Sequence, residues 1–373
     1  MQKAESIHLA STHPPFDTRI FHKECKALAK AGYRVSLIVP HTRDEVVDGV
    51  RLRAVPLPKN GKERLSKTLG QIYRAALAES KDAIFHVHDA ELIFHTFLLK
   101  LRGRTVVYDA HENTHRQVMH QHWIPRLLRR PVSVVMRLAE WLGGRWFDGV
   151  IAAVPEILKN FPGGRAKVVF NFPIADELRL AEPVPYAARP LRVAYVGSIT
   201  EARGAREMVA ALDRLPEDLP VELVLGGPFQ PASLEEAVRQ MPGAARAQFR
   251  GWLRRDQVAG VLGRARAGIV TLHPTPQYVD SYPTKLFEYM STGLPVIASD
   301  FPLWRRIVEE AQCGVLVDPL DPDAIAEAMQ WMLDHPGEAA AMGARGREAI
   351  LDRYSWEQET PTLLAVYEEV RKT

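Results

Sequence analysis

The sequence predicts an α/β protein built from two parallel-sheet domains in tandem. Short runs rich in valine and isoleucine alternate with amphipathic helical patterns along almost the whole chain, and one proline-rich stretch interrupts this alternation. The length of 373 residues fits two domains of ordinary size. A hydrophobic fraction of 46% and a charged fraction of 25% exclude a disordered, collagen-like or coiled-coil chain.

Five apolar runs in the first half predict strands that are buried on both faces of a sheet. They are Ile7–Ser11, Val35–Pro40, Ile84–His88, Val106–Ala110 and Val150–Val154. Helical patterns separate most of these runs, as expected of strands that are joined by helical crossovers. We therefore assign residues 1–172 to a first domain.

The second half repeats the same pattern. Its runs are Leu191–Gly197, Val221–Gly227, Phe249–Trp252, Gly268–Leu272, Pro295–Ser299 and Val315–Val317. Clustered prolines between the halves cannot continue a helix or a central strand, so residues 173–190 are predicted to be a linker and residues 191–354 a second domain. A last helical pattern, roughly Trp356–Arg371, follows Ser355, a residue suited to capping it. We expect residues 355–373 to pack back on the first domain.

Charge and cysteine content narrow the class of protein. Lys+Arg 48 against Asp+Glu 45 leaves a net charge of +3, too balanced for a protein that binds nucleic acid along its length. Cys25 and Cys313 are expected to be buried thiols in a reducing compartment, and no Cys/His cluster has zinc spacing. With no signal-peptide pattern and no apolar run near the roughly 18 residues of a membrane span, we expect a cytoplasmic protein that can still contact the inner face of the cell membrane.

The first motif, YVGSITEARG, follows a predicted strand that ends at Gly197. Glycine lets backbone amides approach a phosphate, and Arg203 at the start of the next helix can clamp one. A plain strand–helix turn with a surface arginine explains the segment equally well. The motif is not GxGxxG, which disfavours a nicotinamide dehydrogenase.

The second motif is DSYPTKLFEYMSTGLP, from Asp280 onward. Thr284 can cap the predicted helix, and Lys285 adds a cation at its positive end. Glu288 lies one turn further on the same face, where a carboxylate can accept two hydrogen bonds from vicinal hydroxyls such as those of a ribose. The alternative is a surface ion pair of about 0.2–0.5 kcal/mol.

At these motifs the sequence resembles the retaining glycosyltransferases of family 4 (glycosyl transferases group 1). That family carries an acidic residue, seven others and a glutamate, then a small-Gly-x-Pro-Val strand, and Asp280, Glu288 and Thr292–Asp300 match this pattern. Further matches are Gly251-Trp252-Leu253 and Leu225-Gly226-Gly227-Pro228. The resemblance covers most of the chain. It implies the GT-B fold, in which an N-terminal acceptor-side and a C-terminal donor-side Rossmann-like domain face each other across a cleft.

The resemblance also implies roles for individual residues on the donor side. Glu288 would hold the nucleotide ribose, and Arg203, where the family usually has lysine, would neutralise the diphosphate with Lys285. Asp280, where the family usually has glutamate, would lie near the sugar hydroxyls. Ser198 replaces a common arginine, which leaves the donor class open. The expected donor-binding set is Gly197, Ser198, Arg203, Gly227, Lys285, Leu286 and Glu288. Neither a metal nor another cofactor is expected, because basic residues take the place of a metal.

On the acceptor side, His111 follows the strand Val106–Ala110 directly. The resemblance implies that it faces the donor sugar, and with Asp280 and Glu288 it makes up the expected catalytic set. Glu112 is a candidate for binding the acceptor, with capping of the next helix as the alternative.

The loop after the first strand supplies further acceptor-binding candidates, His13, Asp17 and Arg19. Asp17 could accept a hydroxyl and Arg19 could hold a phosphate, whereas N-capping of the next helix explains Asp17 equally well. The run from His86 to Asp89 alternates between the faces of a strand. It is interpreted as structural, with His88 and Asp89 as secondary candidates.

The region Trp123–Trp146 is the one local basic stretch. Its arginines and tryptophans are Arg126, Arg129, Arg130, Arg137, Arg145, Trp123, Trp141 and Trp146. Such interleaving suits a peripheral membrane contact. A packed helix with snorkelling arginines is the slightly favoured alternative.

Taken with the resemblance, the sequence predicts a retaining glycosyltransferase. It would move a hexose-type sugar from a nucleotide diphosphate sugar, with UDP favoured and GDP as the second choice, to a saccharide or polyprenyl-linked acceptor in surface polysaccharide synthesis. The alternatives are a sugar-nucleotide epimerase of the same architecture and a non-catalytic sugar-nucleotide binding module.

Overall fold

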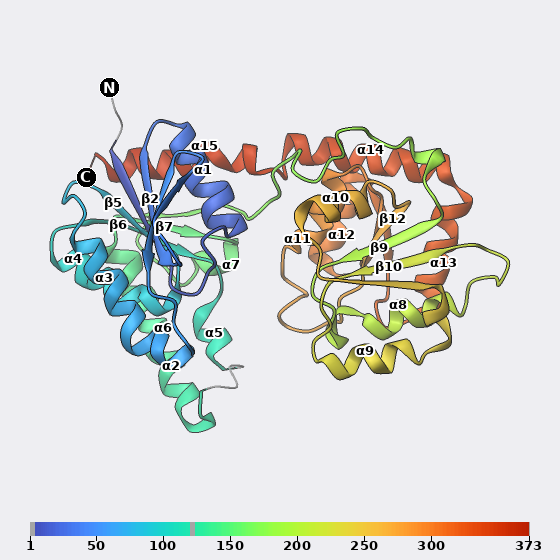
Figure 1. Cartoon of the computed structure of the whole chain (residues 1–373), viewed down its shortest axis with the longest axis horizontal. Helices are drawn as coiled ribbons and strands as arrows, with labels where there is room; N and C mark the ends of the chain where they lie inside the picture. Colours follow the sequence, from blue (N-terminus) through green and yellow to red (C-terminus); the bar gives the residue numbers. More distant parts are fainter. Residues whose placement is uncertain (1–3, 120–123, 373) are drawn as a thin grey trace. The chain divides into compact units, whose positions relative to one another are not determined.

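The computed structural model describes residues 4–119 and 124–372. The chain forms two compact α/β units (Figure 1). The first unit contains the chain up to Asn171 and the chain from Glu359 onward, and the second unit runs from Phe172 to Gln358. Residues 173–190, the expected linker, therefore belong to the second unit, and the C-terminal helix α15 (Trp356–Val370) ends in the first.

An eight-stranded sheet forms the first unit, in the order β3-β4-β2-β1-β5-β6-β7-β8. The strands are β1 (Glu5–Leu9), β2 (Arg34–Pro40), β3 (Glu45–Val47), β4 (Val50–Val55), β5 (Ile84–Val87), β6 (Thr105–Ala110), β7 (Gly149–Ala152) and β8 (Ala166–Val168). Neighbours pair in parallel, except that β3 is antiparallel to β4. All five predicted runs are strands, whereas the edge strands β3 and β8, and β4 next to β3, were not predicted.

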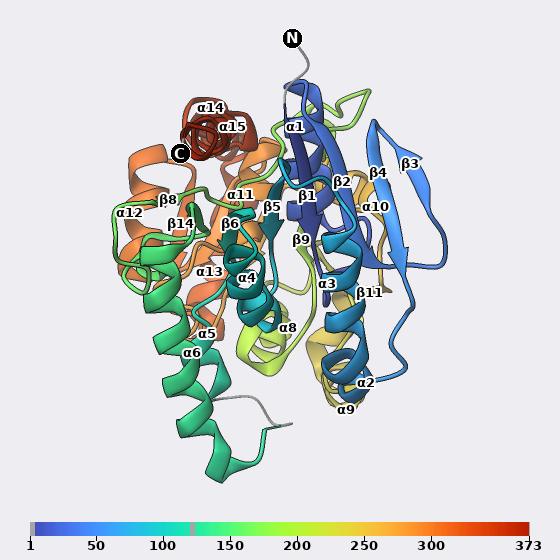
Figure 2. The same cartoon turned by 90° about the vertical axis from the view of Figure 1, so that its left-hand side faces the viewer.

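The helices of the first unit are η1 (Thr18–Cys25), α1 (Lys26–Lys30), α2 (Gly61–Glu63), η2 (Arg64–Thr68), α3 (Leu69–Leu77), η3 (Ala90–Leu92), α4 (Ile93–Leu101), α5 (Thr114–Val118), α6 (Arg126–Trp146) and α7 (Pro155–Leu158). Figure 2 shows α3, α4 and α6 side by side on the first unit, and contacts join neighbouring helices of this row.

The central strands β1 and β5 have two different buried faces. Alternate side chains of one face, such as Ile7 and Phe85, belong to the hydrophobic core. The other face carries His8 and His86, which are also fully buried. Tyr367 of α15 closes this polar face, since its hydroxyl lies 2.8 Å from Ser6 Oγ and 2.9 Å from His86 Nδ1.

A six-stranded parallel sheet forms the second unit, in the order β11-β10-β9-β12-β13-β14. Its strands are β9 (Arg192–Val196), β10 (Glu222–Gly226), β11 (Ala247–Gly251), β12 (Ala267–Val270), β13 (Val296–Ser299) and β14 (Gly314–Val317). Its helices are η4 (Tyr186–Ala188), η5 (Glu201–Arg203), α8 (Ala205–Leu212), α9 (Ala232–Arg239), η6 (Pro242–Arg246), α10 (Arg255–Leu262), α11 (Thr284–Ser291), α12 (Pro302–Ala311), α13 (Pro322–Asp334) and α14 (Pro336–Asp352). Each strand coincides with a predicted run. The predicted class of two parallel-sheet α/β units is confirmed.

Candidate active site

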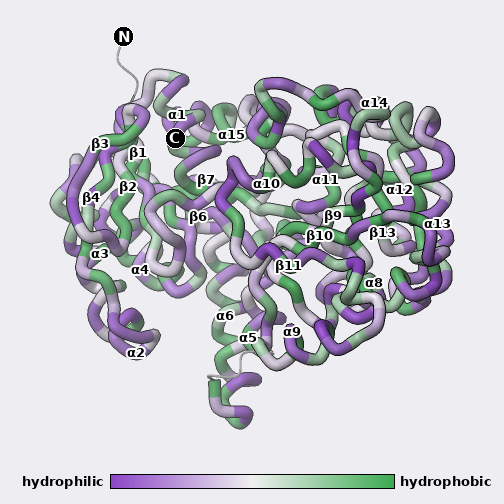
Figure 3. Tube along the Cα trace, turned by 45° about the vertical axis from the view of Figure 1, so that its right-hand side comes forward, coloured by the Kyte–Doolittle hydropathy of each residue, from purple (hydrophilic) through white to green (hydrophobic). Residues whose placement is uncertain are grey.

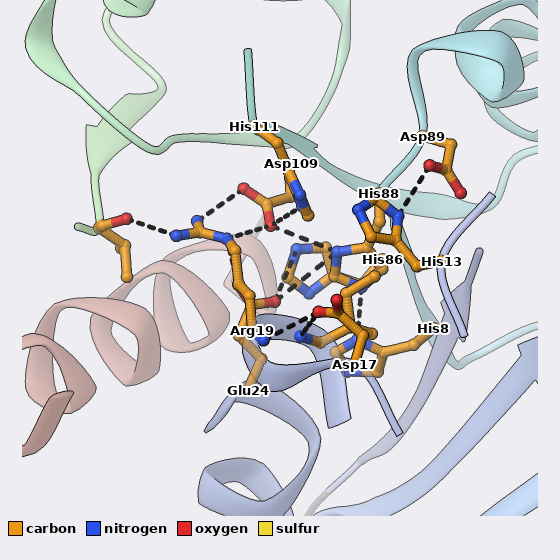
Figure 4. A network of polar contacts seen from close by, with 12 residues as sticks. His8, His13, Asp17, Arg19, Glu24, His86, His88, Asp89, Asp109 and His111 are labelled. Atoms are coloured by element: carbon orange, nitrogen blue, oxygen red, sulfur yellow. Dashed lines mark hydrogen bonds and ion pairs between the residues drawn. The ribbon is translucent and has the colours of Figure 1, made fainter. Parts of the chain in front are cut away.

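Histidines and carboxylates gather at one edge of the first sheet (Figure 4). The strands β1, β5 and β6 are adjacent and parallel, so their carboxyl ends lie together, where doubly wound sheets bind ligands. His13 follows β1, Asp89 follows β5, and Asp109 and His111 lie at the end of β6. The adjacency of these strands, which no local pattern reveals, brings the four side chains into one group.

Each of the two histidines at this edge has its own carboxylate. His111 Nε2 lies 2.7 Å from Asp109 Oδ2, and His13 Nδ1 lies 2.9 Å from Asp89 Oδ1. The ring centroids of the two imidazoles are 5.1 Å apart. The side chain of His13 is 30% exposed and that of His111 is 17% exposed, whereas both carboxylates are buried. Two partly exposed imidazoles, each fixed by a buried carboxylate, can form hydrogen bonds to the hydroxyls of a sugar.

The pairing with Asp89 makes His13 more basic than a free histidine. Burial lowers the pKa of His13, but the hydrogen bond and the negative charge of Asp89 outweigh burial, and the net shift is upward. Burial raises the pKa of Asp89, but its bonds to His13, to the Thr12 hydroxyl and to the Ser11 backbone N–H lower it well below its usual range. The pair therefore carries its opposite charges over a wider pH range than an isolated histidine and aspartate would.

Arg19 lies beneath this edge and does not reach an acceptor. The residue is 3% exposed. Its Nε and Nη2 donate to the two oxygens of Asp109 at 3.0 and 2.9 Å, and its Nη1 donates to Val169 O at 3.0 Å. The expectation that Arg19 binds an acceptor phosphate is wrong, because its guanidinium faces the interior of the first unit. Asp109, which touches both Arg19 and His111, links them.

Two neighbouring candidates also differ from expectation. Asp17 Oδ1 accepts from the backbone N–H groups of Arg19 and Ile20 at 2.8 and 2.9 Å, so the capping alternative for Asp17 is confirmed. Glu112 is exposed, and the N-cap residue of α5 is Asn113, so the capping alternative for Glu112 is wrong. The acceptor role of Glu112 stays a prediction.

A second layer of histidines supports the Arg19–Asp109 pair from below. His88 Nδ1 lies 3.2 Å from Asp109 Oδ2, and His88 Nε2 lies 2.8 Å from His8 Nδ1. Burial lowers the pKa of His8, His86 and His88. Burial and the negative charge of Asp109 raise the pKa of Glu24, whose Oε1 lies 3.0 Å from Arg19 Nε. Each of these shifts favours the uncharged form of its group. Arg19 and Asp109 form the two-pronged ion pair of the layer.

The same layer offers a possible set of metal ligands. Ligand atoms of His8, Glu24, His86 and His88 lie within 4.8 Å of one another, and His88, Asp109 and His111 form a similar group. Two features disfavour a cation there: His8 and His88 are bonded to each other, and the guanidinium of Arg19 contacts Glu24. The expectation that no metal is required stays a prediction.

In the second unit, two glycines let the ends of β9 and β10 approach each other. Gly197 has φ +127° and Gly227 has φ +152°, and a Cβ on Gly227 would lie 2.0 Å from Gly197 O. A Cβ on Gly197 would in turn lie 2.4 Å from Cε of Lys285, in the first turn of α11. No larger residue fits either position, and the side chain of Lys285 packs directly on the glycine backbone.

Two positively charged side chains, Arg203 and Lys285, lie beside these glycines, and Glu288 is near enough to act on the charge of Lys285. Arg203 Nη1 donates to Ser198 O at 3.0 Å, and its Nε lies 3.4 Å from the Tyr278 hydroxyl. Burial, and then the charge of Arg203, lower the pKa of Lys285 to about 8. Among the residues that the structure describes, no carboxylate forms an ion pair with either group. Like charges held together in this way suit a bound anion, because the anion relieves their repulsion.

The hydroxyl groups around these cations are also unpaired. Ser198 Oγ and Thr271 Oγ1 are buried and have no hydrogen-bond partner among the described residues. Thr271 lies against Gly204, since a Cβ there would be 2.8 Å from its Oγ1. Buried polar atoms of a folded protein usually have partners, so these hydroxyls are further candidates for ligand contacts.

Helix α11 carries the remaining donor-side candidates. Its N-cap residue is Pro283, so the prediction that Thr284 caps it is wrong. Leu286 is fully buried, which leaves only its backbone available to a ligand. Asp280 is exposed in the loop before the helix.

The carboxylate of Glu288 has a partner that sequence reasoning missed. Its Oε1 accepts from Arg255 Nη1 at 2.8 Å, and Arg255 also pairs with Glu177 at 2.7 Å. The side chain of Glu288 is 19% exposed. Arg255 is the first residue of α10, two positions after the matched Gly251–Leu253 segment. This position at the start of a helix is the signal that could have identified it. Arg255 holds the carboxylate of Glu288 in one orientation.

Another missed pair lies beyond β12, at the carboxyl edge of the second sheet. His273 Nε2 is 3.2 Å from Glu207 Oε2 of α8. The signal was a histidine directly after the predicted strand Gly268–Leu272, the same position that His111 occupies in the first half.

Comparison with known proteins identifies the family. Residues 18–163 match Glycosyltransferase Family 4, and residues 190–335 match Glycosyl transferases group 1. The chain belongs to the group 1, family 4 glycosyltransferases. The resemblance seen in the sequence is thereby confirmed, and it extends over both units of this glycosyltransferase.

Two relatives come from Mycolicibacterium smegmatis. The α-maltose-1-phosphate synthase is 31% identical over 211 residues, which are 53% of this chain and 52% of that protein. The match therefore spans about half the length of this relative. The phosphatidyl-myo-inositol mannosyltransferase is 26% identical over 359 residues, which cover 92% of this chain and 88% of that protein.

The crystal structure of Anabaena HepE in complex with UDP-glucose has a similar fold. Its TM-score is 0.72 at 12% sequence identity, over 98% of this chain and 100% of that one. A likeness at this identity concerns the fold alone, and it confirms the GT-B architecture of the glycosyltransferase.

The role of Arg19 in the first unit can be tested by its removal. We expect Arg19→Met to lower the free energy of unfolding by about 3–5 kcal/mol, because Asp109 is then buried without its charged partner. Urea unfolding followed by circular dichroism measures the change. The matched control is Arg34→Met, since Arg34 is 62% exposed and 3.8 Å from Glu5; its effect should stay below about 0.5 kcal/mol. Equal, small effects of both substitutions would contradict the assignment.

Proposed function

We propose that this glycosyltransferase moves a hexose-type sugar from a nucleoside diphosphate sugar to a saccharide or lipid-linked saccharide, with retention at the anomeric carbon, in the synthesis of a surface polysaccharide. The observation that carries the proposal is the pair of half-buried cations, Arg203 and Lys285, beside the glycines that end β9 and β10. A diphosphate offers the charge that this pair lacks, and Glu288 lies one turn further along α11, where a ribose would follow.

The donor and acceptor classes rest on further support. HepE binds UDP-glucose on the same fold, which supports UDP as the favoured nucleotide, with GDP as the second choice. The name of the phosphatidyl-myo-inositol mannosyltransferase supports a lipid-linked acceptor. Glu288, oriented by Arg255, would accept hydrogen bonds from the ribose hydroxyls through the oxygen that Arg255 leaves free.

In the proposed reaction, the bond between the anomeric carbon and the diphosphate oxygen breaks through an oxocarbenium-like state. Its electron pair leaves with the nucleoside diphosphate, whose growing charge Arg203 and Lys285 stabilise. The acceptor hydroxyl attacks from the face that the diphosphate leaves, and a phosphate oxygen takes its proton. No protein nucleophile is required. His111, fixed by Asp109, would bind a hydroxyl of the sugar.

Nucleotide preference gives the first test. We expect UDP to raise the melting temperature most, GDP less, and ADP and NAD not at all, with or without EDTA. A ligand at about one hundred times its dissociation constant adds roughly 2.7 kcal/mol, or a few degrees for a chain of this size. Stabilisation by NAD alone, or by none of the four nucleotides, would contradict the proposed donor site.

Substitution of two site residues tests turnover. We expect Glu288→Ala to weaken UDP binding roughly 10- to 100-fold, since it removes hydrogen bonds to a charged acceptor. We expect His111→Ala to lower the rate of transfer while UDP still binds. Calorimetry and release of UDP in the presence of an acceptor measure the two effects. Glu309→Ala is the control, because Glu309 is exposed and pairs only with Arg305 in the structure described. Full activity of either site variant would reject the assignment.

The same assays distinguish the alternative functions. Conversion of the donor without an acceptor would favour an epimerase, and binding without any turnover would favour a non-catalytic module.

The pKa of Lys285 predicts how donor binding depends on pH. A lysine with a pKa of about 8 loses its charge as the pH rises through 8, so the affinity for UDP should fall above that pH, by up to roughly tenfold per pH unit. Calorimetry between pH 6.5 and 9.5 measures the slope. Lys285→Arg should keep the affinity constant over this range, and Lys285→Met should be weak throughout. An unchanged affinity of the unaltered enzyme from pH 7 to 9.5 would refute the prediction.

A further inference from the structure

Helix α6 has two apolar faces, of which only one is packed against the protein. Met136, Ala139 and Gly143 face the interior of the first unit. Large apolar side chains on the opposite side are exposed, namely Leu127, Leu128, Val134, Val135, Leu138, Trp141 and Leu142. Leu127 is 91% exposed and Val134 is 66% exposed. Their spacing repeats along the helix, so they form one stripe, and much of α6 has hydrophobic colouring in Figure 3.

The neighbouring helix α4 extends this exposed apolar surface. Phe94, Leu98 and Leu101 point away from its buried side and are 48%, 40% and 65% exposed. The two helices contact each other (Figure 2). The ring centroids of Phe97 in α4 and Trp146 in α6 lie 5.7 Å apart. The exposed apolar side chains of α4 and α6 thus form one contiguous surface, whereas those on an ordinary protein exterior are scattered singly.

Positive charge accompanies the stripe on α6. Arg126, Arg130 and Arg137 are exposed, and none of them forms an ion pair with a described residue. The guanidinium of Arg145 lies 3.8 Å from the ring centroid of Trp141. The acidic residue of this helix, Glu140, is buried and lies 3.1 Å from His115. The exposed side of α6 therefore combines apolar side chains, tryptophan and uncompensated arginine.

We propose that the surface formed by α4 and α6 binds the anionic face of a lipid bilayer. Leucine, valine and tryptophan would enter the region between headgroups and acyl chains, while the arginines contact lipid phosphates. A second copy of the chain fits less well, since two such surfaces would bring like charges together. Among the described residues no helix has the length and apolar character to cross a bilayer, so α6 would lie along the membrane surface.

The exposure of one side of α6 differs from the interpretation that the sequence slightly favoured. A fully packed helix with snorkelling arginines describes only one side of α6, because the other side is exposed. Trp123, named with this region, lies outside the described residues. The contribution of α4 to the exposed apolar surface was missed, because its sequence, IFHTFLLKL, is equally typical of a helix in a protein core.

Vesicle co-sedimentation tests the proposal without donor or acceptor, so its result does not depend on the proposed reaction. We expect binding to phosphatidylcholine vesicles that contain phosphatidylglycerol, little binding to phosphatidylcholine alone, and weaker binding at 0.5 M salt. Arg126→Glu/Arg130→Glu should reduce the affinity at least tenfold, since each arginine contributes about 1 kcal/mol near an anionic surface. Leu138→Ser/Leu142→Ser should also reduce the affinity for the vesicles, because it removes apolar side chains that would enter the bilayer.

The controls alter exposed residues elsewhere in the first unit. Leu57→Ser and Arg34→Glu should bind like the unaltered protein, since Leu57 is 58% exposed and the Arg34 side chain 62% exposed away from α4 and α6. Retained melting temperatures show that the variants fold. Equal binding by the variants and the controls, or equal binding to neutral and anionic vesicles, would overturn the proposal. A dimer that Leu138→Ser breaks, with no vesicle binding, would assign the surface to a second copy and also overturn it.

Discussion

A buried ion pair between Arg19 and Asp109 fixes the carboxyl edge of the first sheet, where the candidate site lies. Arg19 comes from the first helical segment after β1, and Asp109 from the end of β6, so the pair joins two elements that β5 separates in the sheet. Withdrawing two charges from water costs several kcal/mol per ion. The two-pronged geometry offsets this cost, and His88 Nδ1 adds a contact to Asp109 Oδ2 at 3.2 Å. His111 takes its orientation from this arrangement.

The second unit, in contrast, has two neighbouring positive charges that form no ion pair with a described residue. Where the first unit balances its buried charges, the edge at the ends of β9 and β10 leaves Arg203 and Lys285 without an ion-pair partner among the described residues. Burial lowers the pKa of Lys285 most, the charge of Arg203 lowers it further, and the charge of Glu288 opposes the shift. An arriving anion restores the balance, and the side chains that receive it are already held by Ser198 and by the glycine backbone. Such preorganised charge stabilises a leaving group without reorganisation during the reaction.

The sequence was sufficient for the architecture and for the family, but not for the direction of individual side chains. Every long apolar run became a strand, since burial on both faces leaves a local signature. Strand β4 was missed because Arg51 and Arg53 break the apolar run that was sought. Arg19 was misjudged because its partners, Asp109 and Val169, lie 90 and 150 residues away in the chain. The exposed stripe of α6 has the same local pattern as a packed face, so only the tertiary structure distinguishes the two.

The place of α15 has a consequence for synthesis. The first unit contains both β1 and the end of the last helix, whose Tyr367 closes the polar face over Ser6 and His86. A ribosome therefore completes the whole second unit before the first unit can receive its last element. Until then His8, His86 and Glu24 have no cover on that side, and the newly made first unit must wait in an incomplete state. The second unit, whose residues are continuous, is free to fold during this interval.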